Sequence, residues 1–237
     1  MTAPRRRLPT SLYRSLTERV DRDHQQPDQA FRRRRWVTAV FAVIGAILLG
    51  ISLSVRPADP AFYPLTAGLA ATWVIGGFLS GPLHLGRVRT EGGLRRPWLS
   101  PLLIGFAAAG VYVLGALVVR EIEPLRAYTE QVLAHARYGT LPLVVMVTVL
   151  NGIAEEIFFR GAVFAAIGRR RAVLASTLLY GMATLATGNP MLVFAALTLG
   201  PVLALQRQAS GGILAPIITH VTWSTTMLFV LPALFTV

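Results

Sequence analysis

A chain of 237 residues, of which 54% are hydrophobic and only 14% charged, is too apolar for an ordinary soluble domain, where about a quarter of the residues carry charge. Cysteine is absent, which excludes disulfides, thiolate metal ligands and cysteine nucleophiles. The net charge of +12 comes from arginine without lysine. Because these arginines flank apolar segments, membrane topology explains them and no nucleic-acid partner is expected.

Residues 1–35 form a polar arm with ten arginines and four acids. The arm lacks the cleavage pattern of a secretory signal peptide. Leu8, Leu12, Leu16 and Val20 recur every four residues, which predicts a short helix with one apolar face. Two interpretations remain open, a helix lying on the membrane surface and a solvated, partly disordered tail.

The rest of the chain is divided into apolar blocks of the length that a bilayer requires, about twenty residues per span. Seven candidate spans follow one another at residues 36–55, 62–82, 101–119, 141–167, 172–187, 190–206 and 213–235. Because two of them are short, residues 172–206 could instead form a broken or re-entrant pair. The expected fold class is all-α, a polytopic integral membrane helical bundle of about seven spans.

Arginine is distributed unequally between the two sets of connecting segments. The segments on the side of the N-terminus hold eighteen arginines and those on the opposite side hold four, while Arg160 lies inside a span. Since arginine-rich loops stay in the cytoplasm, we expect the N-terminus and residues 83–100 to be cytoplasmic. Residues 120–140 are expected to face outward as an interfacial helix. Together with the bilayer as partner, this predicts an integral membrane protein.

The pattern of apolar blocks and arginines divides the chain into three regions. Residues 1–35 are the basic cytoplasmic arm, residues 36–140 hold the first spans and the interfacial helix, and residues 141–237 form a membrane core. The unusual polar residues discussed next lie in this core.

Two of the eleven acids lie inside a span, the adjacent pair Glu155 and Glu156. Charges in hydrocarbon are costly, so each requires an explanation. Arg160 follows one turn later and can pair with Glu156 on one helix face, while Glu155 points about 100° away. A Glu156–Arg160 pair that fixes helix packing is the structural interpretation. This interpretation leaves Glu155 without a partner. For Glu155 the better interpretation is a functional site, in which the carboxylate takes a proton from water.

His220 is the other ionisable residue within a span. Ser224 follows one turn later, so the two side chains can face the same point. Two interpretations remain open, a polar pair that lines a cavity and a histidine bonded to a neighbouring helix.

The sequence of residues 155–161 is Glu-Glu-Ile-Phe-Phe-Arg-Gly, and His220 precedes Ser224 by four residues. These segments resemble the first and third motifs of the CAAX-protease/bacteriocin-processing family of intramembrane peptidases. Their order and spacing agree with the family over about residues 143–235. The resemblance implies a CAAX-protease-like core in the cytoplasmic membrane of a bacterium.

The resemblance implies hydrolysis of peptide bonds in membrane-associated proteins or peptides by glutamate-activated water. Carried over by position, Glu155 is the base, Glu156 and Arg160 hold it in place, and His220 stabilises the oxyanion at the scissile carbonyl. The resemblance also allows a divalent metal such as zinc, which Glu155 and His220 would hold. The residues themselves assign no metal or other cofactor.

Two positions depart from the family pattern. The second motif, an aromatic residue followed four residues later by histidine, falls on Tyr180 and Thr184, and residues 136–219 contain no histidine. Ser224 replaces the asparagine of the third motif but can still donate a hydrogen bond. Threonine neither shares a proton near neutral pH nor belongs to the usual zinc ligands. Tyr180, Thr184 and Ser224 are therefore expected to bind rather than to catalyse.

Two functions compete. The first is an intramembrane endopeptidase, favoured by the retained Glu155, Glu156, Arg160 and His220. The second is a non-catalytic member that binds a membrane partner or peptide, as immunity-type relatives are thought to do, and the missing histidine favours it. A proton-coupled transporter is disfavoured because the two halves of the chain show no repeat.

Overall fold

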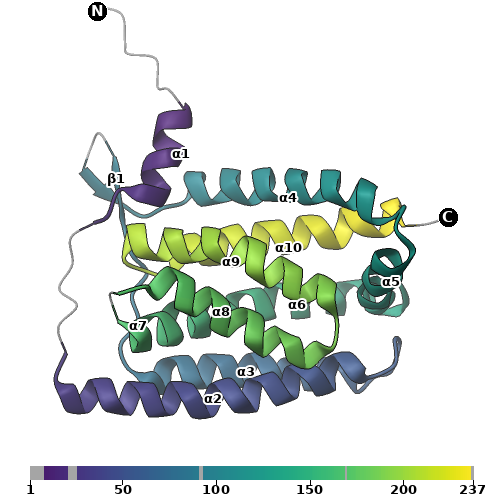
Figure 1. Cartoon of the computed structure of the whole chain (residues 1–237), viewed down its shortest axis with the longest axis horizontal. Helices are drawn as coiled ribbons and strands as arrows, with labels where there is room; N and C mark the ends of the chain where they lie inside the picture. The colour runs from purple at the N-terminus through teal and green to yellow at the C-terminus, as the bar shows by residue number, and fades with distance from the viewer. Residues whose placement is uncertain (1–7, 21–25, 91–92, 169, 236–237) are drawn as a thin grey trace, which may run out of the picture.

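The computed structural model describes residues 8–20, 26–90, 93–168 and 170–235. Within these ranges the long helices run side by side, and consecutive ones run in opposite directions (Figure 1). The expected all-α membrane bundle is therefore confirmed. One small element was not expected, a hairpin of strands β1 (Val88–Thr90) and β2 (Gly93–Arg95) in the second connecting segment.

The N-terminal part of the chain contributes five helices. They are α1 (Leu8–Thr17), α2 (Asp28–Ser54), α3 (Phe62–Ser80), α4 (Leu99–Val119) and α5 (Glu123–Tyr138). The amphipathic helix expected in the arm is present as α1, and Val20 lies beyond its end. The first membrane helix begins at Asp28 and not near residue 36, because no helix breaker follows Pro27 and arginine is a good helix former.

The core is a single long pass followed by three further helices. The pass consists of α6 (Leu141–Glu155), the π-helical segment η1 (Glu156–Val163) and α7 (Phe164–Ile167). The later elements are α8 (Ala172–Thr184), the 3₁₀ turn η2 (Leu185–Thr187), α9 (Pro190–Ser210) and α10 (Leu214–Leu234).

Six helices of the described ranges are long and apolar enough to cross a membrane. The remaining expected span, residues 172–187, is a shorter apolar helix made of α8 and η2. It runs beside α9 with its η2 end directed toward α5 (Figure 1). Six full-length helices and one short one thus stand where about seven spans were expected.

The arginine-rich segments meet at one end of the bundle, which we call the basic end. There the backbone N–H of Val20 donates to Ala209 O at 2.9 Å, and that of Arg87 donates to Ser210 O at 2.9 Å. Arg35 Nε donates to Ala166 O at 3.1 Å. The arm, the β-hairpin and the ends of α7 and α9 therefore share this end (Figure 1).

Helix α5 lies across the opposite end, which we call the α5 end (Figure 1). His135 Nε2 is 3.0 Å from Val55 O, and Asn189 Nδ2 donates to Tyr128 O at 2.7 Å. These bonds connect α5 to the segment after α2 and to the start of α9. The amphipathic segment expected at residues 120–140 is thus a helix that covers one end of the bundle.

An aromatic core joins α3, the long pass and α8. The Trp73 ring lies 4.5 Å from the Phe158 ring and 5.1 Å from the Phe159 ring, and Phe159 lies 4.7 Å from the Tyr180 ring. Trp73, Phe158 and Phe159 are almost fully buried. This packing fixes the position of Tyr180 relative to the paired glutamates.

The two ends of the bundle should lie on opposite sides of the membrane, with the basic end in the cytoplasm. Because the chain has no cysteine, single cysteines report topology without background. Leu94→Cys at the basic end should react with an impermeant maleimide only after cells are opened. Ala127→Cys on α5 should react in intact cells. Labelling of both positions from the same side would contradict this orientation.

Candidate functional site

The paired glutamates lie where the helix geometry of the long pass changes. Glu155 is the last residue of α6, and Glu156 is the first residue of the π-helical segment η1. π-Helical turns are rare and occur often at functional sites, because they redirect side chains relative to a regular helix. Every residue of η1 is buried.

Glu156 and Arg160 form the ion pair expected from their spacing. Arg160 Nη1 donates to Glu156 Oε1 at 3.0 Å, and both side chains are excluded from solvent. Arg160 Nη2 also donates to Gly200 O at 3.2 Å, which connects η1 to α9. The guanidinium lies 4.7 Å from the centre of the Tyr180 ring. A buried charge pair requires such additional partners to offset its loss of hydration.

His220 also binds Glu156. Its Nδ1 lies 2.8 Å from Glu156 Oε1, and the imidazole is buried. Since a carboxylate paired with Arg160 only accepts hydrogen bonds, Nδ1 must carry the proton in this contact. The second nitrogen, Nε2, has no hydrogen-bond partner within the described ranges. Glu156 therefore fixes both the orientation and the tautomer of His220.

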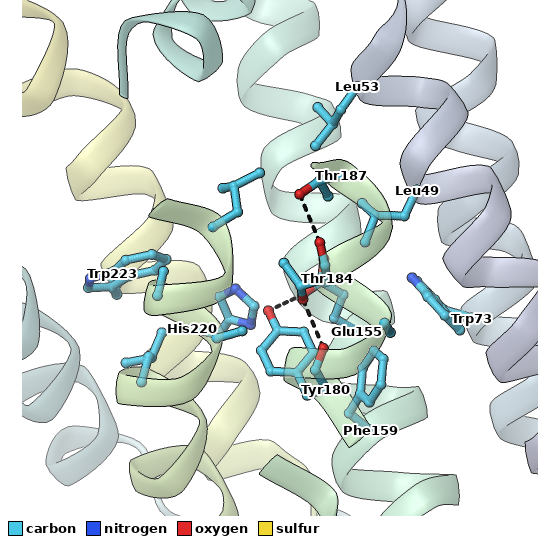
Figure 2. Close-up of a pocket in the computed structure, with 15 residues that line it drawn as sticks. Leu49, Leu53, Trp73, Glu155, Phe159, Tyr180, Thr184, Thr187, His220 and Trp223 are labelled. Carbon is cyan, nitrogen blue, oxygen red and sulfur yellow. Dashed lines mark hydrogen bonds between the residues drawn. The ribbon is translucent and has the colours of Figure 1, made fainter. Parts of the chain in front are cut away.

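Glu155 has a different partner, on α8. The Tyr180 hydroxyl donates to Glu155 Oε2 at 2.6 Å (Figure 2). The distance is typical of a strong hydrogen bond to an ionised carboxylate. Because Tyr180 occupies only one oxygen, Oε1 keeps its capacity to accept a bond from water or substrate. The residue pattern placed Tyr180 at the site but did not identify this contact.

The two replaced motif positions make bonds to the backbone. Thr184 Oγ1 donates to Tyr180 O at 2.8 Å (Figure 2). Ser224 Oγ donates to Val221 O at 3.3 Å. Both hydroxyls therefore use their proton within their own helix, and each keeps acceptor capacity.

A cavity of about 190 Å³ lies in front of Glu155 (Figure 2). Its polar wall includes Glu155, Tyr180, Thr184 and His220, which come from three different helices. Leucine, alanine and tryptophan side chains form most of the remaining wall. The volume holds several water molecules, each of which takes about 30 Å³ in the liquid.

A second, larger cavity of about 630 Å³ shares Glu155 and His220 with the first. Ser224 also lines it. The structure thus brings Glu155, His220 and Ser224 to one cavity, and His220 is also bonded to a neighbouring helical segment, so both interpretations of this histidine describe part of its environment. Glu156 and Arg160 lie behind this surface and line neither cavity.

The comparisons with known proteins agree with this geometry. Residues 137–226 match the family model described as type II CAAX prenyl endopeptidase Rce1-like. This part of the chain is Rce1-like. No curated protein and no solved structure is significantly similar to the chain.

The Rce1-like match confirms the resemblance to the CAAX-protease/bacteriocin-processing family. It includes the paired glutamates, Tyr180, Thr184 and His220. The family supports a CAAX-type membrane endopeptidase as the kind of function, and the six apolar helices make the chain an integral membrane protein.

The donor set of the Rce1-like core does not fit a resident zinc ion. Hydrolytic zinc is usually held by three protein ligands. Within the described ranges no group of three histidine, cysteine, aspartate or glutamate side chains could hold a metal. Glu155 and His220 supply two donors, and Thr184 replaces the imidazole of the family pattern.

One residue that supports the site, Arg207, was not identified from the sequence. Arg207 belongs to the charges that indicate topology, yet it lies within α9 and is buried. Its Nε donates to Arg160 O at 2.7 Å, and its guanidinium lies 5.2 Å from the Phe164 ring. Nothing in the sequence distinguishes this arginine from those of the loops, since it is near the end of an apolar block.

Removing either charge of the Glu156–Arg160 pair should lower the amount of folded protein. Glu156→Gln leaves the arginine uncompensated in the membrane, and Arg160→Ala does the same to the glutamate. Such losses typically cost about 3–5 kcal/mol. Quantitative blotting of membranes, with size-exclusion profiles of tagged protein, measures the effect. The matched control is Glu155→Gln, the same chemical change one residue away, which should accumulate normally. Wild-type abundance of Glu156→Gln would contradict the prediction.

Proposed function

We propose that this protein is an intramembrane endopeptidase that hydrolyses peptide bonds of membrane-associated proteins or peptides, with Glu155 as the base that activates water. One observation carries the proposal: Glu155 and His220 line a shared cavity, while the Glu156–Arg160 ion pair that holds His220 lies behind them. If the Glu156–Arg160 pair served only helix packing, the second carboxylate, that of Glu155, would not be needed at the cavity wall.

Charge balance supports a shared proton between Glu155 and His220. The charges of Glu156 and Arg160 cancel within their ion pair. An apolar surrounding favours a site without net charge. The remaining two groups are neutral overall when one proton is distributed between them, either on Glu155 or on His220 Nε2. With the proton on His220, Glu155 is a base and Nε2 is a hydrogen-bond donor.

Hydrolysis follows from this second state. A water molecule between Glu155 Oε1 and the scissile carbonyl transfers a proton to the carboxylate while its oxygen bonds to the carbonyl carbon. The oxyanion that forms accepts a hydrogen bond from His220 Nε2–H. Glu155 then gives its proton to the departing nitrogen as the C–N bond breaks. The products are a carboxylic acid and an amine, and the proton returns to its starting distribution.

Tyr180 positions the base in this scheme. Its hydroxyl holds Glu155 Oε2 at 2.6 Å, and its ring is fixed by Phe159 and Arg160. Positioning matters because a misplacement of about 1 Å can reduce a rate about a hundredfold. The phenol thus does part of what the histidine of the second motif would do, since it orients the carboxylate, but it does not relay protons near neutral pH.

A second candidate function rests on Thr184. This residue occupies the position of the missing histidine, and its hydroxyl donates to Tyr180 O. A non-catalytic protein that binds a membrane partner or peptide in the same cavity would retain the polar wall without needing a proton relay. The two candidates differ in whether the carboxylate of Glu155 is required.

The decisive comparison is between cells carrying the wild-type protein and cells carrying Glu155→Gln. Glutamine keeps the size and hydrogen bonding of the side chain but cannot accept the proton of water. A set of membrane peptides trimmed only by the wild-type protein should appear in a proteomic comparison. Glu121→Gln, at an exposed position outside the site, is the matched control and should process as the wild type does. Unchanged processing by Glu155→Gln at normal abundance would leave the binding function.

Tyr180→Phe tests the positioning role. The change removes one hydroxyl and keeps the ring that packs against Phe159. A hydrogen bond to a charged group is worth about 1.5–3 kcal/mol, so processing should slow at least about tenfold while abundance stays normal. Processing at the wild-type rate would show that Glu155 does not need this bond.

A further inference from the structure

The larger cavity lies in one half of the bundle. It is lined by α10 only from His220 onward, by α6 only as far as Glu155, and by α4 only from Val111 onward. Five residues of α5 close it at the far end. The cavity therefore extends from the candidate base to the α5 end, and none of the arginines in the described ranges lines it.

The cavity reaches the outer surface of the bundle along the seam between α4 and α9. Two of its lining residues, Val111 on α4 and Phe194 on α9, are 67% and 53% exposed. Within the described ranges, the hydrogen bonds that join these two helices are those of the Tyr112 hydroxyl, with Ala195 O at 3.3 Å and with Thr198 Oγ1. Both helices are candidate membrane spans, so this seam faces lipid.

Asn151 lines this cavity, and its side chain carries a buried hydrogen-bond acceptor that is unused. Its Nδ2 donates to Val147 O at 2.9 Å, which fixes the orientation of the amide, and its buried Oδ1 has no partner within the described ranges. Asn151 lies one turn before Glu155 and therefore on the same face of α6. A Cβ built on the next residue, Gly152, would lie 3.7 Å from Ser224 Oγ. Asn151 thus belongs to the same stretch of α6 as Glu155, and both residues line the larger cavity together with Ser224.

We propose that the larger cavity binds an apolar peptide segment of the substrate, which enters from the bilayer through the α4–α9 seam and donates a backbone N–H to Asn151 Oδ1. The wall is mostly apolar, which suits hydrophobic side chains, and the unpaired acceptor suits a peptide group. A hydrocarbon chain fills the same volume but offers no N–H, so the acceptor would stay unpaired at a cost. The inference rests on the proposed function for its chemistry and adds the substrate class and its route.

The seam is tested with two glycines of α4. A Cβ would meet no atom within 4 Å at Gly110 or at Gly115, and both are exposed, but only Gly115 lines the cavity. The reporter is Thr148→Cys, which lines the cavity outside the proposed site. Full-length protein in phospholipid vesicles is treated with N-(1-pyrenyl)maleimide, an apolar thiol reagent.

Gly115→Trp should fill the seam and slow labelling of the reporter about tenfold, which corresponds to a penalty of about 1.4 kcal/mol. Gly110→Trp places the same indole on the same helix outside the cavity and should leave the rate within about twofold of the parent. Equal rates in the two variants would overturn the route through the seam.

The occupant of the cavity is tested by whether an added ligand protects the Thr148→Cys reporter from the maleimide. A synthetic leucine–alanine transmembrane peptide should slow labelling, and Asn151→Leu should weaken this protection about fivefold, the effect of one neutral hydrogen bond of about 1 kcal/mol. Labelling without peptide should be the same in both proteins, which controls for folding. Equal protection in both would overturn the role of Asn151. Protection by farnesol or palmitate that exceeds protection by the peptide would overturn a peptide occupant.

These measurements do not require hydrolysis, so the two proposals can fail separately. Glu155→Gln carrying the reporter should be labelled and protected like the parent. If processing continues in Glu155→Gln while peptide protection persists, the hydrolytic function is wrong and the peptide site stands. If processing depends on Glu155 but the peptide gives no protection, the binding site is wrong and the function stands.

Discussion

The carboxylate of Glu156 is the interaction on which the arrangement of this site depends. One of its oxygens accepts hydrogen bonds from both Arg160 and His220. Arg160 in turn binds the backbone of Gly200. A single buried charge therefore connects the long pass to α9 and α10. In a membrane interior, where water cannot satisfy these groups, each of them constrains the others.

The adjacent glutamate is not needed to neutralise Arg160, because Glu156 already pairs with that arginine. Glu155 is directed to another helix, where the Tyr180 hydroxyl holds one oxygen and the cavity meets the rest of the side chain. The π-helical turn that begins at Glu156 separates the two environments within one residue. Two chemically identical side chains thus occupy a structural and a cavity-lining position, since adjacent residues of a helix point about 100° apart.

The bundle is also divided along its length. Within the described ranges, the backbone hydrogen bonds that join segments far apart in sequence lie at the basic end, together with most of the arginines. The larger cavity and the covering helix α5 occupy the other half. The aromatic core of Trp73, Phe158 and Phe159 lies between these regions and packs against Tyr180. Most of the arginines therefore lie toward one membrane surface and the larger cavity toward the other. The close-packed aromatic side chains lie between them, beside the buried Glu156–Arg160 pair.

The sequence by itself determined the helical membrane fold, the approximate spans, the Glu156–Arg160 pair and the family resemblance of about residues 143–235. Each of these depends on local periodicity, composition or motif spacing, which a linear chain displays. Only the tertiary structure decided that His220 binds Glu156, that Tyr180 binds Glu155, that Arg207 is buried, and that Asn151 keeps an unpaired oxygen at a cavity. These contacts join helices that are far apart in sequence, and their partners are set by how the helices pack. The beginning of a π-helical turn at Glu156 was equally invisible, because the same residues are compatible with a regular helix.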